Sequence, residues 1–248
     1  MSPTGIRRDY VNLASGRQVH YRRAGTGQAV LLLHPSPLSS EFMQPLMDFL
    51  SERFDVIAMD TPGYGHSDAL PEPAENLAPY VQVIGEFVAA LQLPQVVLYG
   101  NATGAQLAIE AAKALPQQVH ALVLENAAAF SDAERAAFYG RYFPDLSPRE
   151  DGSHLTLAWQ MARQTYLYFP WFDTREEARV AQAEPPTELV QATALACLRA
   201  GPDYARAYRA AFENERPEQL AAVAQPVRVL LWQGSILLDY SRRLQVAG

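Results

Sequence analysis

Five short apolar runs, each ending at a turn residue, constrain the fold of this chain more than any other feature. Runs of this length indicate strands that are buried on both faces of a parallel sheet. They are Ala29–Leu33, Val56–Met59, Val96–Tyr99, Ala121–Leu124 and Val227–Trp232. Segments with apolar residues at helical spacing lie between them. This alternation predicts βαβ units and an α/β fold with a doubly wound, mostly parallel sheet.

Three helices and an N-terminal hairpin complete the predicted sheet layer. The helical spacing covers Ser39–Arg53, Val81–Leu91 and Thr103–Leu115. Asp9–Leu13 and Arg17–Arg22 flank a polar Ala-Ser-Gly turn, which is typical of two antiparallel strands. We expect this hairpin at an edge of the sheet.

Residues 131–217 interrupt the alternation of strands and helices. They are rich in alanine, arginine, glutamate and aromatic residues, and their apolar positions have helical spacing. An all-helical insertion between two strands predicts a cap over the carboxyl ends of the sheet, where ligands bind in such folds. We therefore divide the chain into a first part of the core at 1–130, a helical cap (lid) at 131–217 and a last part of the core at 218–248.

The charge and composition limit the classes of partner. The 248 residues carry a net charge of −7, and 49% of them are hydrophobic. Nucleic-acid binding needs a basic surface, so we expect no nucleic acid, and we expect a small-molecule ligand or substrate. No apolar run is long enough to span a membrane, and the N-terminal residues have no signal-peptide core, so we expect no membrane partner. A single cysteine, Cys197, fits a cytoplasmic protein.

The segment most informative about chemistry is Gly100-Asn101-Ala102-Thr103-Gly104. It joins a predicted strand directly to a predicted helix, as a G-x-S-x-G nucleophile elbow does. Small residues at both ends allow the tight turn. Such a turn also directs backbone N–H groups and a helix N-terminus at the substrate.

With two further motifs, the chain resembles the α/β-hydrolase superfamily. His34-Pro35-Ser36-Pro37 is similar to the family's His-Gly-x-Pro oxyanion loop, and residues 60–67, Asp-Thr-Pro-Gly-Tyr-Gly-His-Ser, are similar to its D-x-x-G-x-G-x-S turn. The three motifs occur in the family's order and spacing. The resemblance is to lidded members such as haloalkane dehalogenases, epoxide hydrolases and small esterases. It implies hydrolysis of small apolar esters or related substrates without a cofactor.

The chain departs from the family pattern at each position of the catalytic triad. Ala102 occupies the nucleophile position, and a methyl group cannot attack a substrate. Leu237 stands where the acid is expected, so Asp239 is the nearby candidate. The family's following strand, helix and histidine do not appear before Gly248, and we expect them to be missing.

The resemblance assigns other roles to residues that remain. The backbone N–H groups of Ser36 and Thr103 would form the oxyanion hole, and Thr103 is at best a substitute nucleophile. The expected pocket residues are His34, Pro35, Asn101, His154, Trp159 and Trp171. The cap aromatics at 166–172 form either the core of the cap or part of the pocket wall.

The five histidines have no metal-ligand spacing, so we expect no metal site. We expect His20 at the surface, His34 as a structural residue of the oxyanion loop, and His66 in an exposed loop. His120 precedes a strand on the side of the sheet away from the site, and His154 lies in the cap.

Three accounts of function remain open. The chain is a hydrolase impaired by Ala102, an enzyme in which Asp60, His66 or Asp239 assists a bound water, or a non-catalytic binding protein that keeps the pocket and lid. The last predicted strand would also leave an apolar edge unpaired, which predicts poor solubility or a homodimer through that edge.

Overall fold

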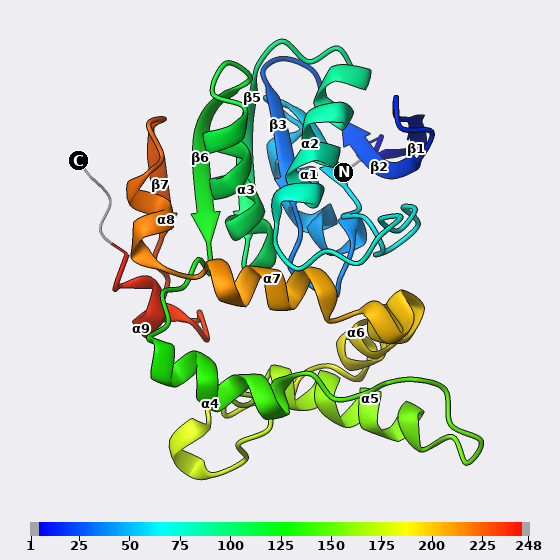
Figure 1. The fold of residues 1–248 in the computed structure, drawn as a ribbon, viewed down its shortest axis with the longest axis vertical. Helices are drawn as coiled ribbons and strands as arrows, with labels where there is room; N and C mark the ends of the chain where they lie inside the picture. Colours follow the sequence, from blue (N-terminus) through cyan, green and yellow to red (C-terminus); the bar gives the residue numbers. More distant parts are fainter. Residues whose placement is uncertain (1–4, 245–248) are drawn as a thin grey trace.

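A computed structural model describes residues 5–244, in which seven strands form one sheet with the order β1-β2-β4-β3-β5-β6-β7 (Figure 1). The strands are β1 Arg7–Asn12, β2 Gln18–Ala24, β3 Ala29–Leu33, β4 Asp55–Met59, β5 Val96–Asn101, β6 Val119–Glu125 and β7 Val227–Leu230. β1 and β2 are antiparallel to their neighbours, and β4, β3, β5, β6 and β7 are mutually parallel. The predicted doubly wound, mostly parallel sheet is confirmed.

The helices follow the predicted alternation through the first half of the chain. They are α1 Gln44–Leu50, α2 Ala78–Ala90, α3 Thr103–Ala114, α4 Asp132–Tyr142, α5 Ser153–Thr165, α6 Thr187–Ala200, α7 Arg206–Asn214, α8 Pro217–Ala221 and α9 Leu238–Ser241. The segment predicted as one helix over Ser39–Arg53 is a short 3-10 helix, Ser40–Met43, followed by α1. A proline in the first turn of α1 explains the break, because it fits a helix start but not a helix interior. No helix within residues 5–244 is long and apolar enough to span a membrane.

Helices cover both faces of the sheet because successive strand side chains point in opposite directions. On β3, Leu31 and Leu33 pack in the core formed with α2 and α3. Leu32 lies on the other face, in a core that includes Met43 and Met47. All three leucines are completely buried. A parallel strand buried on both faces accounts for the continuous apolar run seen in the sequence.

The helices of residues 131–217 lie beyond the carboxyl ends of the parallel strands (Figure 1). α7 crosses directly under the sheet, and α4 and α5 lie farther from it. Ala207, Ala210 and Ala211 on α7 belong to the core of the sheet, whereas Phe212 packs in a separate aromatic cluster with residues of α4 and α5. α7 therefore joins the two layers, although its residues fall in the range predicted for the cap.

A buried carboxylate, Asp60, connects the loop after β4 to its neighbours. Its oxygens accept hydrogen bonds from the backbone N–H of Ser40 at 2.7 Å and of His66 at 2.9 Å, and one lies 2.8 Å from Nδ1 of His20. His20 is only 3% exposed, so the prediction that it lies at the surface is wrong. β2, which carries it, lies between β1 and β4 rather than at the sheet edge.

Burial opposes ionisation of Asp60, but the hydrogen bonds with His20, Ser40 and His66 outweigh it and hold the pKa of this carboxyl well below its ordinary value. A depressed pKa means that the folded state favours the charged form. The resulting stabilisation is present above the ordinary value of 3.8 and is lost as the pH falls below it.

We expect Asp60→Ala to lower the free energy of unfolding by about 3 kcal/mol or more, because it leaves several buried donors without an acceptor. Asp68→Ala is the control, since the side chain of the exposed Asp68 accepts one hydrogen bond, from the N–H of Gln18. That change should cost less than about 1 kcal/mol. Urea unfolding at neutral pH measures both values, and equal losses in the two variants would contradict the structural role of Asp60.

Candidate active site

The turn between β5 and α3 has the strained backbone of a nucleophile elbow. Ala102 stands at its apex with φ 50° and ψ −111°, a conformation that residues with a Cβ rarely adopt. Such strain costs about 1–3 kcal/mol and is typical of functional sites. The N–H of Ala102 donates to the backbone oxygen of Glu125 at 3.0 Å, which holds the turn against the end of β6.

Two glycines permit this turn by letting α3 approach the sheet closely. A Cβ at Gly100 would collide with the backbone oxygen of Gly104, and a Cβ at Gly104 would collide with the backbone oxygen of Leu33 on β3. Both collisions are with backbone atoms, which cannot move away cheaply. The Gly-x-x-x-Gly spacing is therefore a steric requirement of this strand-to-helix connection.

Two backbone N–H groups beside the elbow have no protein acceptor. Thr103 is the first residue of α3, so its N–H has no partner inside the helix. Neither this group nor the N–H of Ser36 donates to another described residue. The hydroxyl of Thr103 is buried, lacks a hydrogen-bond partner and does not reach the cavity wall.

A cavity of about 400 Å³ separates the carboxyl ends of the strands from the helices of residues 131–217. Ser36 and Ala102 line its floor, and Pro35, Asn101 and Trp171 of the predicted pocket also lie on its wall. Aromatic rings from α4, α7 and the connecting loops form much of the remaining wall. Phe169 and Trp171 belong both to the aromatic core cluster and to this wall. These two aromatic residues therefore serve as core of the cap and as pocket wall at once.

Three of the predicted pocket residues do not line this cavity. His34 is buried under the oxyanion loop, where Nε2 accepts the N–H of Thr61 at 2.9 Å. His154 accepts the N–H of Arg149 at 3.1 Å, and Trp159 on α5 is 38% exposed. Helical spacing had placed the last two in the cap without showing which face of α5 is turned to the sheet.

The candidate acid Asp239 also lies outside the cavity, which corrects its assignment. Its side chain is 83% exposed and pairs with Arg242 one helical turn away, at 3.0 Å. Leu237, at the position where the family resemblance places the acid, does line the cavity. None of the five histidines, all within the described residues, reaches the cavity wall.

Two carboxyl groups that the sequence analysis did not single out line the cavity. Glu125, at the end of β6, accepts hydrogen bonds from the amide of Asn101 at 3.0 Å and from the hydroxyl of Tyr99. Glu215 follows α7 and is 4% exposed, and burial raises its pKa well above its ordinary value. Glu125 follows an apolar run and carried a weak signal, whereas nothing in the sequence around Glu215 distinguishes it from a surface glutamate.

The one thiol of the chain also lies on the cavity wall. Cys197 on α6 is completely buried, and burial raises the pKa of its thiol to about 12. Only the thiolate is a strong nucleophile, so this cysteine is almost entirely in its unreactive form at neutral pH. It does not replace the missing nucleophile.

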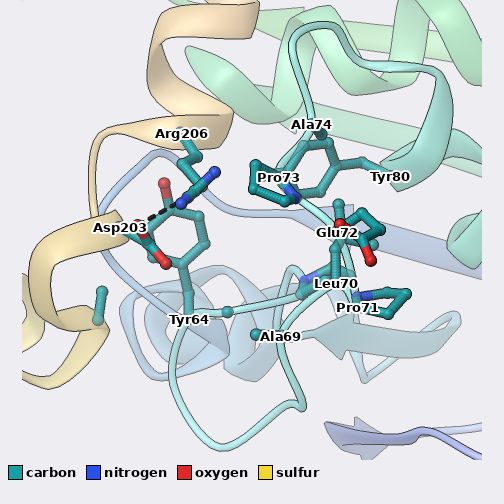
Figure 2. A pocket seen from close by; sticks show the side chains of 13 residues that line it. Tyr64, Ala69, Leu70, Pro71, Glu72, Pro73, Ala74, Tyr80, Asp203 and Arg206 are labelled. Carbon is teal, nitrogen blue, oxygen red and sulfur yellow. Dashed lines mark ion pairs between the residues drawn. The ribbon is translucent and has the colours of Figure 1, made fainter.

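A second hollow, of about 240 Å³, lies away from the elbow (Figure 2). The proline-containing loop with Leu70 and Glu72 forms one side, and the ion pair between Asp203 and Arg206, 2.7 Å apart, lies on the other. Ala102 does not contribute to it. The cavity over Ala102 is therefore the one that the elbow geometry serves.

Comparisons with known proteins agree with the fold. A model described as "Alpha/beta hydrolase family" matches residues 30–240. An (E)-2-((N-methylformamido)methylene)succinate hydrolase from Acinetobacter baylyi is 28% identical over 47% of this chain and 44% of its own length. The human serine hydrolase BPHL is 31% identical over 50% of this chain and 45% of its own. The chain thus spans less than half the length of these curated relatives.

Among solved structures, a bacterial membrane phospholipase A superposes with a TM-score of 0.72 at 20% identity, covering 96% of this chain and 74% of that chain. At this level of identity the similarity shows the fold alone.

The strain at Ala102 predicts opposite effects of glycine at two nearby alanines. We expect Ala102→Gly to raise the free energy of unfolding by roughly 1 kcal/mol, since glycine tolerates positive φ. Ala105→Gly, inside α3, should lower it by about 1 kcal/mol or more. Chemical denaturation of the two variants measures the difference, and a loss of stability in Ala102→Gly would show that the turn is not strained.

Proposed function

Because this chain belongs to the alpha/beta hydrolase family, we propose that its cavity binds small, largely apolar esters and related carbonyl compounds. The carbonyl oxygen would accept hydrogen bonds from the N–H groups of Ser36 and Thr103. The observation that carries this proposal is the apolar cavity over Ala102, beside two N–H groups that lack a protein acceptor. Such paired donors stabilise negative charge on a substrate oxygen.

The cavity wall favours neutral over anionic ligands. No lysine or arginine is among the described residues that line it, whereas Glu125 and Glu215 are. A dicarboxylate of the kind named for the Acinetobacter baylyi relative would meet two carboxyl groups and no basic partner. Burying an anion without a basic partner is unfavourable, because its lost hydration is not replaced.

The chain with Ala102 would bind such compounds without the covalent step of a serine hydrolase. No nucleophile comes from the three candidate side chains. Ala102 has only a methyl group, the hydroxyl of Thr103 does not reach the cavity wall, and the thiol of Cys197 is neutral. An oxyanion hole and binding alone leave a residual acceleration of roughly 10³–10⁴-fold in a disabled serine protease. We therefore infer an impaired hydrolase whose main remaining property is binding.

The alternative of an enzyme that activates water has less support. Asp60, His66 and Asp239 were its candidates, and none of them lines the cavity. A non-catalytic small-molecule binding or regulatory protein is the second candidate function. It is favoured by the cavity being intact while the nucleophile position is an alanine.

We also propose a cytoplasmic location and a homodimer. A lone cysteine with no disulfide partner fits a reducing compartment. β7 pairs only with β6 among the described strands, and Leu230, Leu231 and Trp232 at its end are 42–53% exposed. A second copy of the chain would cover this edge.

Binding can be tested with acetophenone labelled with ¹³C at its carbonyl. We expect its C=O stretching band to move to lower frequency in the complex than in heptane, because the two N–H groups polarise the carbonyl. Ala181→Phe, which narrows the cavity, should weaken binding by about tenfold or more. Ala183→Phe, two residues away and exposed, is the control.

Calorimetric titration measures the affinities, and infrared difference spectra measure the band. A band at the heptane position would show that the two N–H groups do not bind the carbonyl oxygen. Equal affinities in the two phenylalanine variants would show that acetophenone does not bind in the cavity.

The dimer can be tested with one charge. We expect Leu231→Lys to shift the chain to a monomer, because an edge strand with lysine resists pairing. Leu195→Lys is a control of equal exposure, 53%, on α6. Sedimentation velocity measures the mass, and a monomeric parent chain at high concentration would contradict the proposal.

A further inference from the structure

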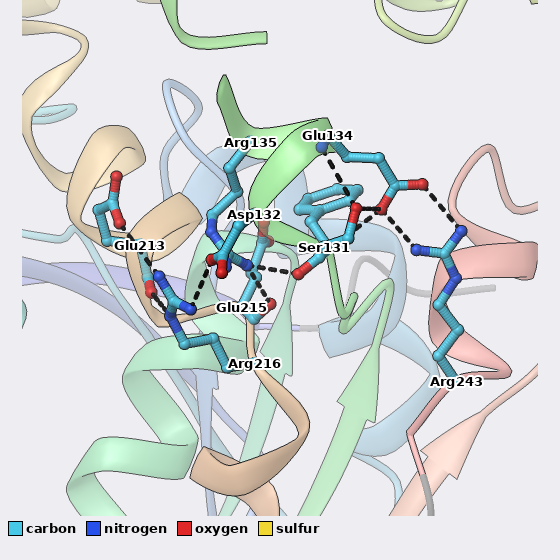
Figure 3. A network of polar contacts seen from close by, with 9 residues as sticks. Ser131, Asp132, Glu134, Arg135, Glu213, Glu215, Arg216 and Arg243 are labelled. Atoms are coloured by element: carbon cyan, nitrogen blue, oxygen red, sulfur yellow. Dashed lines mark hydrogen bonds and ion pairs between the residues drawn. The ribbon is translucent and has the colours of Figure 1, made fainter. Parts of the chain in front are cut away.

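Glu215 lines the cavity, and its carboxyl has no hydrogen-bond partner among the described residues. Its Oε2 is buried and unpaired, and no described residue donates to either oxygen. The backbone of the same residue is held firmly, since its carbonyl accepts from the N–H of Phe130 at 3.0 Å and from Arg135 at 3.4 Å (Figure 3). The chain therefore fixes the place of this carboxyl while leaving it unsatisfied.

Aromatic residues surround this part of the cavity. Phe130, Tyr142, Tyr208 and Phe212 all line the wall with Glu215. Their ring centroids are close to one another, with 5.4 Å between Phe130 and Phe212 and 4.9 Å between Tyr142 and Phe212. Aromatic rings around a carboxyl form an environment that attracts cations through both the ring electrons and the charge.

Arg135, whose charge acts on the Glu215 carboxyl, is already engaged with other groups. Arg135 on α4 donates to the backbone oxygens of Phe130 and Glu215 and pairs with Asp132 (Figure 3). It does not line the cavity, and no described ion pair joins it to the Glu215 carboxyl. The hydroxyls of Tyr142 and Tyr208 lie 3.1 Å apart and satisfy each other.

We propose that Glu215 and the surrounding rings form a subsite for an organic ammonium group carried by the ligand. The inference rests on the proposed function, because the ligand occupies the same cavity and its carbonyl lies at Ser36 and Thr103. It narrows the substrate class to amine-bearing or quaternary-ammonium carbonyl compounds. The described wall also favours a cationic over an anionic group, because it has no lysine or arginine and includes Glu125 as a second carboxyl.

Proton release accompanies the binding of a cation at this subsite. In the empty cavity burial raises the pKa of Glu215 well above its ordinary value, and the charge of Arg135 only partly opposes this. Tyr142 and Tyr208 face the same carboxyl, and burial raises the pKa of both phenols, so they stay neutral. A bound ammonium favours the carboxylate, and the carboxyl proton passes to solvent. The affinity for a permanent cation should therefore increase with pH.

The test compares two compounds of the same shape, phenyltrimethylammonium and tert-butylbenzene, which differ by one charge. At a pH of about 8.5, we expect the cation to bind about tenfold more tightly than the hydrocarbon. Glu215→Gln should lower the affinity for the cation by about tenfold and change the affinity for the hydrocarbon by less than about threefold. It should also remove the increase of cation affinity with pH.

Glu213→Gln is the matched control, since Glu213 is exposed near the end of α7, two residues before Glu215, and does not line the cavity. It should leave both affinities and the pH profile unchanged. Thermal unfolding checks that Glu215→Gln is folded, and the pH profile of the parent chain tests the subsite without any variant.

Two results overturn the inference. If the hydrocarbon binds as tightly as the cation across the pH range, the ammonium subsite is contradicted and the proposed function is not. Cation affinity that is independent of pH in the parent chain and unchanged in Glu215→Gln would contradict the subsite in the same way. Failure of both compounds and of acetophenone to bind would instead contradict the proposed function itself.

Discussion

The close approach of α3 to the sheet is the constraint on which the site depends. Gly100 and Gly104 have no Cβ, so the helix can begin almost in contact with β3 and β5. This forces Ala102 into a positive-φ turn whose N–H is tied to the end of β6. The same turn leaves the N–H of Thr103 without a protein acceptor, next to Ala102 at the cavity floor. One steric condition thus sets the strained residue, the free donor and the position of the helix N-terminus together.

The cavity exists because α7 has two different faces. Its small alanines pack closely in the sheet core, while Tyr208 and Phe212 are directed at the aromatic cluster beyond it. A helix with large residues on both faces would be held farther from the strand ends. The aromatic rings are too large and rigid to fill the space between the layers completely, and the remaining volume opens over Ala102. The binding space is consequently a product of packing between the layers.

The sheet and the elbow were predictable from sequence because both have short-range signals. Buried strands such as Ala29–Leu33 are apolar throughout, and the glycine spacing of the elbow is a local steric need. The cavity wall was only partly predictable, since helical spacing placed Trp159 and His154 in the cap but not the direction of their side chains. His20, Glu125 and Glu215 acquire their environments from contacts with residues far away in sequence, such as the 40 positions between His20 and Asp60. No local pattern encodes such contacts.

Asp60 and Glu215 show how buried carboxyls distinguish structure from function. Both are almost inaccessible to solvent, yet the pKa of Asp60 is lowered and that of Glu215 is raised. The difference is the presence of partners, because Asp60 receives its hydrogen bonds from the protein and Glu215 receives none on its carboxyl. An unpaired buried acid destabilises the fold, and a methionine at this position would avoid that cost. The missing partner of Glu215 is therefore best sought outside the chain, in the ligand.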